Sequence, residues 1–351
     1  MVDNLKESVM AHCSIPFQKG FPLTPGLPII PDISHFADLL HVSVSFLMGV
    51  HSIIEKEYYT KKIPKKGNGF RIIEAPSVKL KGIQAWILRN ILDKVVSSPY
   101  STAYKKGCSI VNNVNPHQNG LFFLSFDLKD FFPSIYERRI VGIFNALGYS
   151  RTISQFLAHI CTFRGHLPQG AVTSPALSNL VAYHLDYRLG GYAGKKKFVY
   201  TRYADDITFS SGNRNVLSSS RRYIERIIKN EGFVVNTAKT HFSGPGTKSC
   251  ITGLVKNNSC PSFSVGRKKK NHMKSVIFNL IINNRVIDDK YPSIESVECW
   301  VKYASMVEGN DDCDYLRRYI SRLSSNQKRM GPQPSDCSPV SVEVYSDHFC
   351  W

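Results

Sequence analysis

Two adjacent aspartates, Asp205 and Asp206, lie inside an otherwise apolar segment, residues 198–209, and constrain the fold more than any other feature. Strand-forming residues flank the pair, a run of three lysines precedes the segment, and Ser211-Gly212 follows it. This pattern predicts two short strands joined by a tight turn, with the carboxylates at its tip. Neighbouring carboxylates repel each other, and a divalent cation that binds their oxygens removes this cost. A solvated turn is the alternative, because Asp is common in turns.

A third carboxylate follows a similar apolar segment. Residues 122–126 have the composition of a strand, and Asp127 stands at its end. The chain between Asp127 and Asp205 is long enough for helices and a returning strand. If the two strands are neighbours in one sheet, the three carboxylates converge and can hold two metal ions. Such a site activates an attacking oxygen and stabilises a leaving oxygen during an in-line phosphoryl displacement.

The net charge favours a polyanionic partner. Lys and Arg number 45 against 27 Asp and Glu, which leaves a formal charge of +18. A globular chain this basic is typical of nucleic-acid-binding proteins, whose affinity depends strongly on salt. A membrane is not expected, because no apolar run approaches the length of a spanning helix and the first residues lack a signal-peptide pattern. The 9 cysteines contain no Cys-x-x-Cys motif, which favours reduced thiols in a cytoplasmic protein over disulfides or zinc.

An ordered set of motifs along the chain resembles reverse transcriptases, specifically the bacterial retron type. The motifs occupy residues 63–73, 80–84, 126–134, 167–179, 200–206, 232–240 and 251–255. The resemblance spans roughly residues 35–325. It implies an α+β fold of the right-hand polymerase type, with fingers, a palm whose mixed or antiparallel sheet is covered by helices, a helical thumb, and no RNase H domain.

Domain boundaries follow from the motifs together with local composition and periodicity. Residues 35–59, 77–96 and 218–230 are expected to be helical, and residues 65–69 are expected to form a hairpin turn. The expected domains are a proline-rich arm at 1–34, fingers at 35–120 with a contribution from about 137–170, a palm at 121–255, a helical thumb at 256–330 and a polar tail at 331–351.

The resemblance implies the catalytic centre. Asp127, Asp205 and Asp206 are expected to bind two Mg²⁺ ions, and the backbone carbonyl of Leu128 completes one coordination shell. Tyr203 and Ala204, which precede the aspartate pair, are expected near the primer end.

The resemblance also implies a nucleotide site, formed by Lys65, Lys66, Arg71, Phe132, Gln169 and Lys239. The lysines of the hairpin turn and Arg71 would bind the triphosphate, since Arg suits bidentate phosphate binding. Phe132 would exclude a ribose 2′-hydroxyl, and Lys239 would protonate pyrophosphate. Gly170, which is expected to bind primer or template, would allow close backbone approach beside Gln169. The alternatives are a solvated turn for the lysines, a core position for Phe132 and a structural ion pair for Lys239.

Two elements indicate retrons rather than other reverse transcriptases. Asn113 and His117 match the retron signature Asn-Ala-x-x-His, with Val114 replacing the usual Ala, and Ile251-Thr252-Gly253 stands where retron enzymes carry Val-Thr-Gly. In the family these elements are associated with recognition of the enzyme's own RNA. The basic residues that open the thumb are expected to take part, namely Arg267, Lys268, Lys269 and Lys270. The alternatives are a structural His117 and a turn glycine at Gly253.

The resemblance further implies the reaction. A cognate structured non-coding RNA is the expected template, and a branching guanosine in it would supply the 2′-hydroxyl that primes synthesis from deoxynucleoside triphosphates. The expected product is multicopy single-stranded DNA joined to RNA, made in anti-phage defence with a separate effector protein and with host RNase H. Open alternatives are another bacterial reverse transcriptase, defence-associated or group-II-intron-like, and a catalytically idle RNA-binding scaffold.

Overall fold

The structure is a computed structural model that describes residues 26–65, 69–256, 262–283, 285–309, 316–321 and 325. The chain forms two compact units, one of Met1–Cys108 with Phe122–Phe242 and one of Ser109–Leu121 with Ser243–Trp351. These units do not follow the expected domain boundaries, and the division into fingers, palm and thumb stays a prediction. The expectations for most of the N-terminal arm, for Lys66 and for the C-terminal tail lie outside the described residues.

A four-stranded sheet lies at the centre of the first unit. Its strands are β3 (Phe122–Asp127), β4 (Val199–Tyr203), β5 (Asp206–Ser211) and β6 (His241–Ser243), in the order β4-β5-β3-β6. Both β3 and β4 run antiparallel to β5. The predicted hairpin around the aspartate pair is therefore confirmed, as is the prediction that the strand ending at Asp127 is its neighbour.

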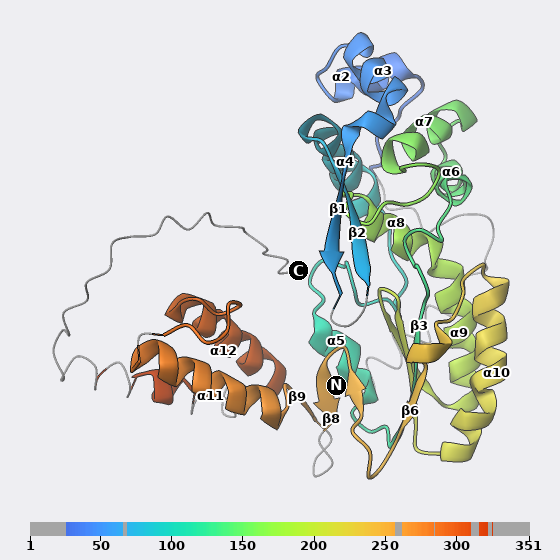
Figure 1. Ribbon diagram of the computed structural model, residues 1–351. Coiled ribbons are helices and arrows are strands. Elements are labelled where there is room, and N and C mark those ends of the chain that lie inside the picture. Colours follow the sequence, from blue (N-terminus) through green and yellow to red (C-terminus); the bar gives the residue numbers. More distant parts are fainter. Residues whose placement is uncertain are drawn as a thin grey trace, which may run out of the picture. The chain divides into compact units, whose positions relative to one another are not determined.

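Further helices complete the core of the first unit. They are α6 (Glu137–Ala146), α7 (Arg151–Cys161), α8 (Ser174–Val181), α9 (Tyr183–Lys196) and α10 (Arg214–Asn230). Figure 1 shows α9 and α10 side by side along the strands. The amphipathic helix expected at residues 218–230 is α10, and its apolar face buries Leu217, Ile224, Ile227 and Ile228. Helices combined with antiparallel strands confirm the α+β class.

The N-terminal part of the first unit carries a two-stranded hairpin. Its elements are α2 (Ile33–Leu39), α3 (Val44–Ser52), the 3₁₀ helix η2 (Ile54–Glu57), β1 (Tyr58–Pro64), β2 (Phe70–Pro76), α4 (Val78–Asn90) and the 3₁₀ helix η3 (Leu92–Lys94). Residues 35–59 were expected to be helical, and most of them are, although in three separate pieces, α2, α3 and η2, with Tyr58 and Tyr59 already in β1. His41 adopts a left-handed conformation, φ 55°, and the Ser43 side chain caps a new helix, so the chain turns between α2 and α3. None of the helices in the described part of the chain is by itself long and apolar enough to span a membrane, although α2 and α3, bent by 106°, pass that test as a pair.

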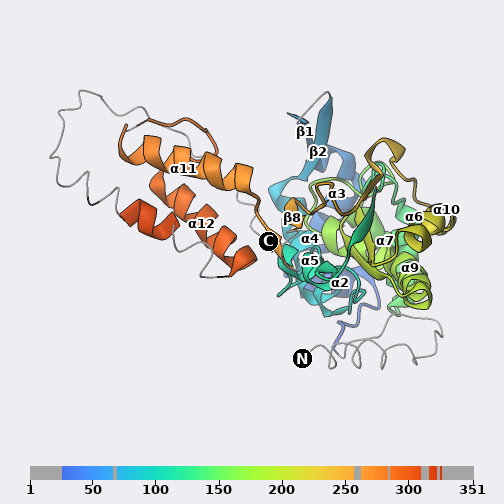
Figure 2. The ribbon, with the colours of Figure 1, turned by 90° about the horizontal axis from the view of Figure 1, so that it is seen from below.

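The second unit combines a small sheet with helices. Its elements are α5 (Ile110–Val114), the 3₁₀ helix η4 (Asn115–His117), β7 (Cys250–Ile251), β8 (Leu254–Lys256), β9 (Phe263–Ser264), α11 (Arg267–Ile281) and α12 (Ile294–Glu308). Figures 1 and 2 both show α11 and α12 side by side, and their buried side chains share one apolar cluster with Leu316. The expectation of helices in this region is confirmed. The three short strands before α11 were not predicted.

Candidate active site

Three carboxylates meet where β3 and β5 end. Asp127 is the cross-strand partner of Asp206, and the Leu128 amide donates a hydrogen bond of 3.0 Å to the Asp205 carbonyl. Tyr203 faces Asp206 across the hairpin, and Ala204 makes the turn in a left-handed conformation with φ 56°. The structure thus brings together the residues that the sequence placed 78 positions apart.

The electrostatics of this cluster fit a hard divalent cation. Burial, followed by the negative charges of Asp205 and Asp127, raises the pKa of Asp206 to about 6. Burial is also the main cause that raises the pKa of Asp205, and Asp127 adds to it. Repulsion of this kind is relieved when a cation binds the carboxylate oxygens. Within the described ranges, however, no group of three or more His, Cys, Asp or Glu side chains is already arranged to hold a metal ion.

Both oxygens of Asp127 are engaged by groups from one short segment. The Asn236 side-chain amide donates to Oδ1 at 3.1 Å, and the Lys239 ammonium donates to Oδ2 at 2.8 Å. The Asn236 backbone amide also donates to the Asp127 carbonyl at 2.8 Å. The hydrogen bond to Asp127 raises the pKa of Lys239, which remains protonated and largely exposed. Sequence reasoning missed Asn236, although it lies three residues before Lys239 in the same motif.

A buried ionic cluster lies directly behind the catalytic turn. Arg202 donates from Nε and Nη2 to the two oxygens of Asp186, at 2.7 and 2.8 Å, and both side chains are fully buried. Its Nη1 donates to the Ala204 carbonyl at 3.1 Å and to the Asn179 side-chain oxygen at 3.2 Å. Tyr200 donates its hydroxyl to Asp186. The cluster therefore fixes the backbone one residue before Asp205. Sequence reasoning missed it, although an arginine inside the apolar run of β4 was a visible signal.

Ala204 and Tyr203 differ in how deeply they are buried. Ala204 is buried, so its contribution is the turn itself and the carbonyl that Arg202 holds. Tyr203 is half-buried beside Asp206, and burial raises the pKa of its hydroxyl. The expected contact with the primer end stays a prediction for both residues.

The expected nucleotide-binding hairpin docks on the loop that carries Gln169. The Glu74 amide on β2 donates to the Gln169 carbonyl at 2.9 Å. Gly170 has φ +142°, and a Cβ added there would lie 2.8 Å from the Glu74 carbonyl oxygen. The close backbone approach expected at Gly170 is made by β2, and the expected contact of Gly170 with primer or template stays a prediction. Arg71 lies on the same strand, and its charge lowers the pKa of Asp205 slightly against the larger effect of burial.

Phe132 lies at the edge of the core, in a loop just after β3. It is partly buried, and its ring lies 5.5 Å from that of Phe131 and 6.2 Å from that of Tyr104. This position is compatible with both a core residue and a ring that faces a sugar. Lys65 is exposed at the end of β1, where its amide donates to the Gly69 carbonyl.

The residues expected to recognise RNA lie together in the second unit. Asn113 is buried, and its side-chain amide donates a long hydrogen bond of 3.5 Å to the Thr252 hydroxyl. His117 is fully buried, and burial lowers its pKa to about 3, so the imidazole is neutral. Ile251 is buried at the end of β7, and Thr252 and Gly253 make a left-handed turn whose carbonyl at Gly253 accepts from Lys269. Any direct contact with RNA therefore falls to the surface residues around this buried pair.

A basic groove of about 940 Å³ opens beside these residues, within the second unit. Its polar and charged lining includes Asn115, Gln118, Lys256, Arg267, Lys270 and Lys274. Lys270 forms an ion pair with the buried carboxylate of Glu308, whereas Arg267 is exposed at the start of α11. Lys268 and Lys269 are exposed on the same helical turn.

Comparison with known proteins agrees with the site. The family model described as "Reverse transcriptase (RNA-dependent DNA polymerase)" matches residues 63–275. The chain is 38% identical to the retron Ec86 reverse transcriptase of Escherichia coli over 84% of this chain and 88% of that protein. It is 34% identical to the retron Mx65 reverse transcriptase of Myxococcus xanthus over 69% of this chain and 61% of that protein.

Among solved structures, one match is a telomerase from Candida albicans in complex with a fragment of telomeric RNA. The match covers 79% of this chain and 61% of the telomerase chain. Its sequence identity is 14%, and its TM-score of 0.46 is too low to establish a shared fold. The family match and the sequence relatives are sufficient without it. The chain belongs to the retron-type reverse transcriptases and is an RNA-directed DNA polymerase.

Proposed function

We propose that this polymerase reverse-transcribes part of a cognate structured non-coding RNA into multicopy single-stranded DNA that stays joined to RNA through a 2′-hydroxyl. The observation that carries the proposal is the meeting of Asp127, Asp205 and Asp206 beside Lys239 in a chain related to retron enzymes. The product would serve anti-phage defence together with a separate effector protein, and host RNase H would remove the copied RNA. The enzyme would act in the cytoplasm.

In this proposal the carboxylates form the metal site of the reaction. Asp127, Asp205, Asp206 and the Leu128 carbonyl would hold two Mg²⁺ ions, which activate the primer hydroxyl and stabilise the leaving pyrophosphate when bound. Asp205 and Asp206 must be ionised to bind them, so the raised pKa values make loading dependent on pH. Lys239 must leave Asp127 Oδ2, which frees its ammonium to donate a proton to the departing pyrophosphate.

The nucleotide site would be completed from β2 and two loops. Arg71, together with Lys65 and Lys66 of the hairpin turn, would bind the triphosphate. Gln169 would contact the nucleotide from the loop on which β2 docks, with Gly170 keeping the two backbones close. Phe132 would exclude a ribose 2′-hydroxyl. Tyr203 would lie beside the primer end, and Ala204 would shape the turn that carries it.

The assignment to polymerase subdomains keeps the boundaries expected from the sequence. Fingers would comprise residues 35–120 with part of 137–170, the palm residues 121–255, and the thumb residues 256–330. The second unit would bind the cognate RNA along its basic groove, since phosphate binding needs such a concentration of Lys and Arg. The contact between buried Asn113 and half-buried Thr252 would hold the shape of that surface.

Purification of the protein with its bound nucleic acid tests the proposal. From its native operon, the wild-type protein is expected to retain a branched species that is sensitive to both RNase and DNase. The Asp205→Asn variant is expected to retain the RNA without DNA, because only synthesis needs the metal site. Unlinked DNA, or DNA primed from a protein hydroxyl, would assign the enzyme to another lineage. RNA without DNA in the wild type would favour an idle scaffold.

A further inference from the structure

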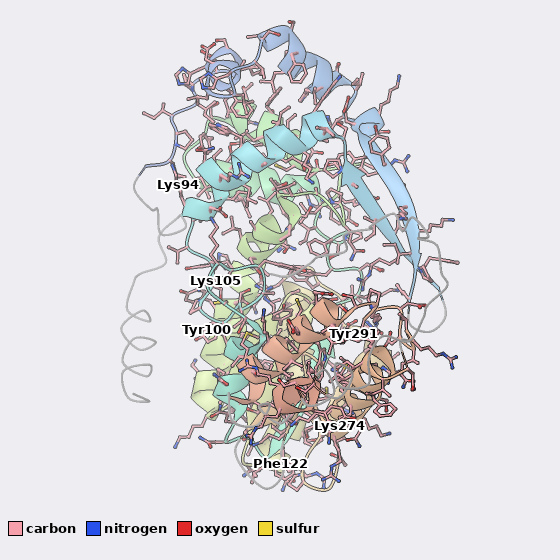
Figure 3. All side chains as sticks on the ribbon, turned by 90° about the vertical axis from the view of Figure 1, so that its left-hand side faces the viewer. Lys94, Tyr100, Lys105, Phe122, Lys274 and Tyr291 are labelled. Carbon is pink, nitrogen blue, oxygen red and sulfur yellow. The ribbon has the colours of Figure 1, made fainter. Side chains whose placement is uncertain are left out.

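Tyr104 has an unusual backbone beside the active site. Its φ of +58° lies in the left-handed region, which a bulky side chain occupies only with backbone strain. Such strain persists where the surrounding structure holds it in place, and it is concentrated at functional sites. Figure 3 marks Tyr100 and Lys105, which bracket this segment on the connection that follows Lys94.

The buried cluster behind the catalytic turn holds the segment that leads into Tyr104. The Asn179 side-chain amide donates to the Ala103 carbonyl at 2.8 Å, and the Ser101 hydroxyl donates to the Asn179 side-chain oxygen at 2.8 Å. The Thr102 amide donates to the Arg202 carbonyl at 3.0 Å. The same cluster therefore fixes the backbone before Tyr104 and the backbone before Asp205.

The Tyr104 side chain contacts the expected sugar gate, Phe132, and is influenced by the charge of Asp205. Its ring centroid lies 6.2 Å from that of Phe132, whose own ring has Phe131 as a second neighbour at 5.5 Å. The residue as a whole is 36% exposed, but burial of its hydroxyl group raises the pKa to about 12, and the negative charge of Asp205 adds to this effect. The phenol therefore lies within the electrostatic field of the catalytic site and is neutral in the working range of pH.

We propose that Tyr104 is a positioning residue for Phe132 and a determinant of the choice of deoxynucleotides over ribonucleotides. The inference rests on the proposed role of Phe132 as the sugar gate. With Tyr104 and Phe131 against it, the Phe132 ring keeps one orientation and cannot move aside for a 2′-hydroxyl. Without the Tyr104 ring, Phe132 gains room to rotate, and ribonucleotides compete.

The test compares kcat/KM for a deoxynucleotide and the matching ribonucleotide on a primed RNA template. The full-length protein would be tested as wild type and as Tyr104→Ala, Tyr104→Gly, Tyr104→Phe and Phe132→Val. Tyr104→Gly removes the ring without backbone strain, because glycine accepts φ +58° freely. The ratio of the two constants does not depend on the folded fraction. Tyr223→Ala, at a half-exposed tyrosine on α10, serves as the control.

Tyr104→Ala and Tyr104→Gly are expected to lower the deoxynucleotide preference by about tenfold, and Tyr104→Phe and the control to stay within about twofold. The double variant Tyr104→Ala with Phe132→Val is expected to be no less selective than Phe132→Val alone, since Tyr104 acts through Phe132. A further loss in the double variant, or an unchanged ratio in both Tyr104 variants while Phe132→Val is relaxed, would overturn the inference and leave the proposed function intact. A wild type that extends no DNA would instead refute the proposed function.

Discussion

Asp127 and Lys239 form an ion pair in which the Lys239 ammonium lies 2.8 Å from Asp127 Oδ2. The lysine thus neutralises one carboxylate of the cluster, and Asn236 holds the other oxygen of the same group. Asp205 and Asp206 form no such ion pair within the part of the chain that the structure describes, and burial is the main cause that raises their pKa values. The pair explains how three carboxylates can lie together before a cation binds.

Replacing Asp205 or Asp206 with Asn is expected to abolish DNA synthesis. Each change preserves the shape of the side chain but removes a negative charge that the metal site needs. Single-turnover extension on a primed RNA template should fall by at least about a thousandfold, the order of magnitude attributed to electrostatic stabilisation in catalytic sites. Asp130→Asn, close to Asp127 in the chain but outside the carboxylate cluster, is the control. Near-normal extension by either variant would remove that residue from the metal site.

Stability of the metal-free protein is expected to fall as pH rises from about 4 to 7. The pKa of Asp206 is about 6 in the folded protein, above the ordinary value of 3.8, so the folded state holds its proton more tightly. The stabilisation of the folded state by this proton is fully present below pH 3.8, and it is lost as pH rises through 6. The residue as a whole stays exposed to solvent although neighbouring atoms bury its carboxyl group, so solvent screening should keep the effect below about 1 kcal/mol.

Urea unfolding at several pH values checks this dependence. The Asp206→Asn variant should show a flatter profile between pH 4 and 7, as it has no carboxyl group to titrate there. Addition of Mg²⁺ at pH 7 should raise the stability of the wild type more than that of the variant, since ligands that bind the folded state stabilise it. Equal profiles for the two proteins would contradict the assigned shift.

The Lys239→Met substitution is expected to slow the chemical step by about a hundredfold, in the range attributed to general acids. The measurement is single-turnover extension as a function of pH at saturating Mg²⁺. A lysine that donates a proton gives an alkaline limb in the wild-type profile that the variant lacks. Lys229→Met, at an exposed lysine on α10, should leave the profile unchanged. If Lys239→Met lowers only the melting temperature, the ion pair is purely structural.

The Arg202→Met substitution is expected to destabilise the protein by about 3–5 kcal/mol, because it leaves the Asp186 carboxylate buried without a partner. Adding Asp186→Leu to it should recover part of this loss, since the uncompensated charge is then removed. Arg188→Met is a matched control, as its ion pair with Glu231 is 43% exposed at the arginine and should contribute less than about 1 kcal/mol. Similar urea midpoints for Arg202→Met and Arg188→Met would contradict this account.

Local patterns in the sequence were enough to predict the catalytic hairpin, the neighbouring strand and the amphipathic α10. The alternation of apolar residues and the turn between Tyr203 and Asp206 depend on adjacent residues, which periodicity detects. The partnership of Arg202 with Asp186 could not be predicted, because a charged residue within a strand is ordinarily solvent-exposed and its partner comes from another element.

The left-handed backbone at Tyr104 and the break at His41 were also beyond the sequence. A bulky tyrosine disfavours that conformation and a histidine adopts it only in a minority of cases, so tertiary contacts decide where it occurs. The short strands β7, β8 and β9 have two or three residues each, too few for any alternation to show. Buried Asn113 and His117 were predicted as functional positions, but their burial depends on packing within the second unit.

The Gly170→Ala substitution is expected to weaken nucleotide binding more than it affects folding. Alanine is strained at φ +142°, and its Cβ would lie 2.8 Å from the Glu74 carbonyl oxygen, so β2 must move away from the Gln169 loop. Arg71 lies on the same strand, three residues from Glu74, and would move with it. The KM for the incoming deoxynucleotide should therefore rise by about tenfold, equivalent to about 1.4 kcal/mol of binding free energy.

Gly212→Ala provides the matched control for this substitution. Gly212 lacks a positive φ, and no atom lies within 4 Å of a Cβ added there. Its KM should stay within about twofold of the wild-type value, as unhindered surface changes have small effects. Steady-state incorporation on a primed RNA template, with melting temperatures measured in parallel, separates binding from folding. An unchanged KM for Gly170→Ala would mean that the position of β2 does not govern how the triphosphate is held.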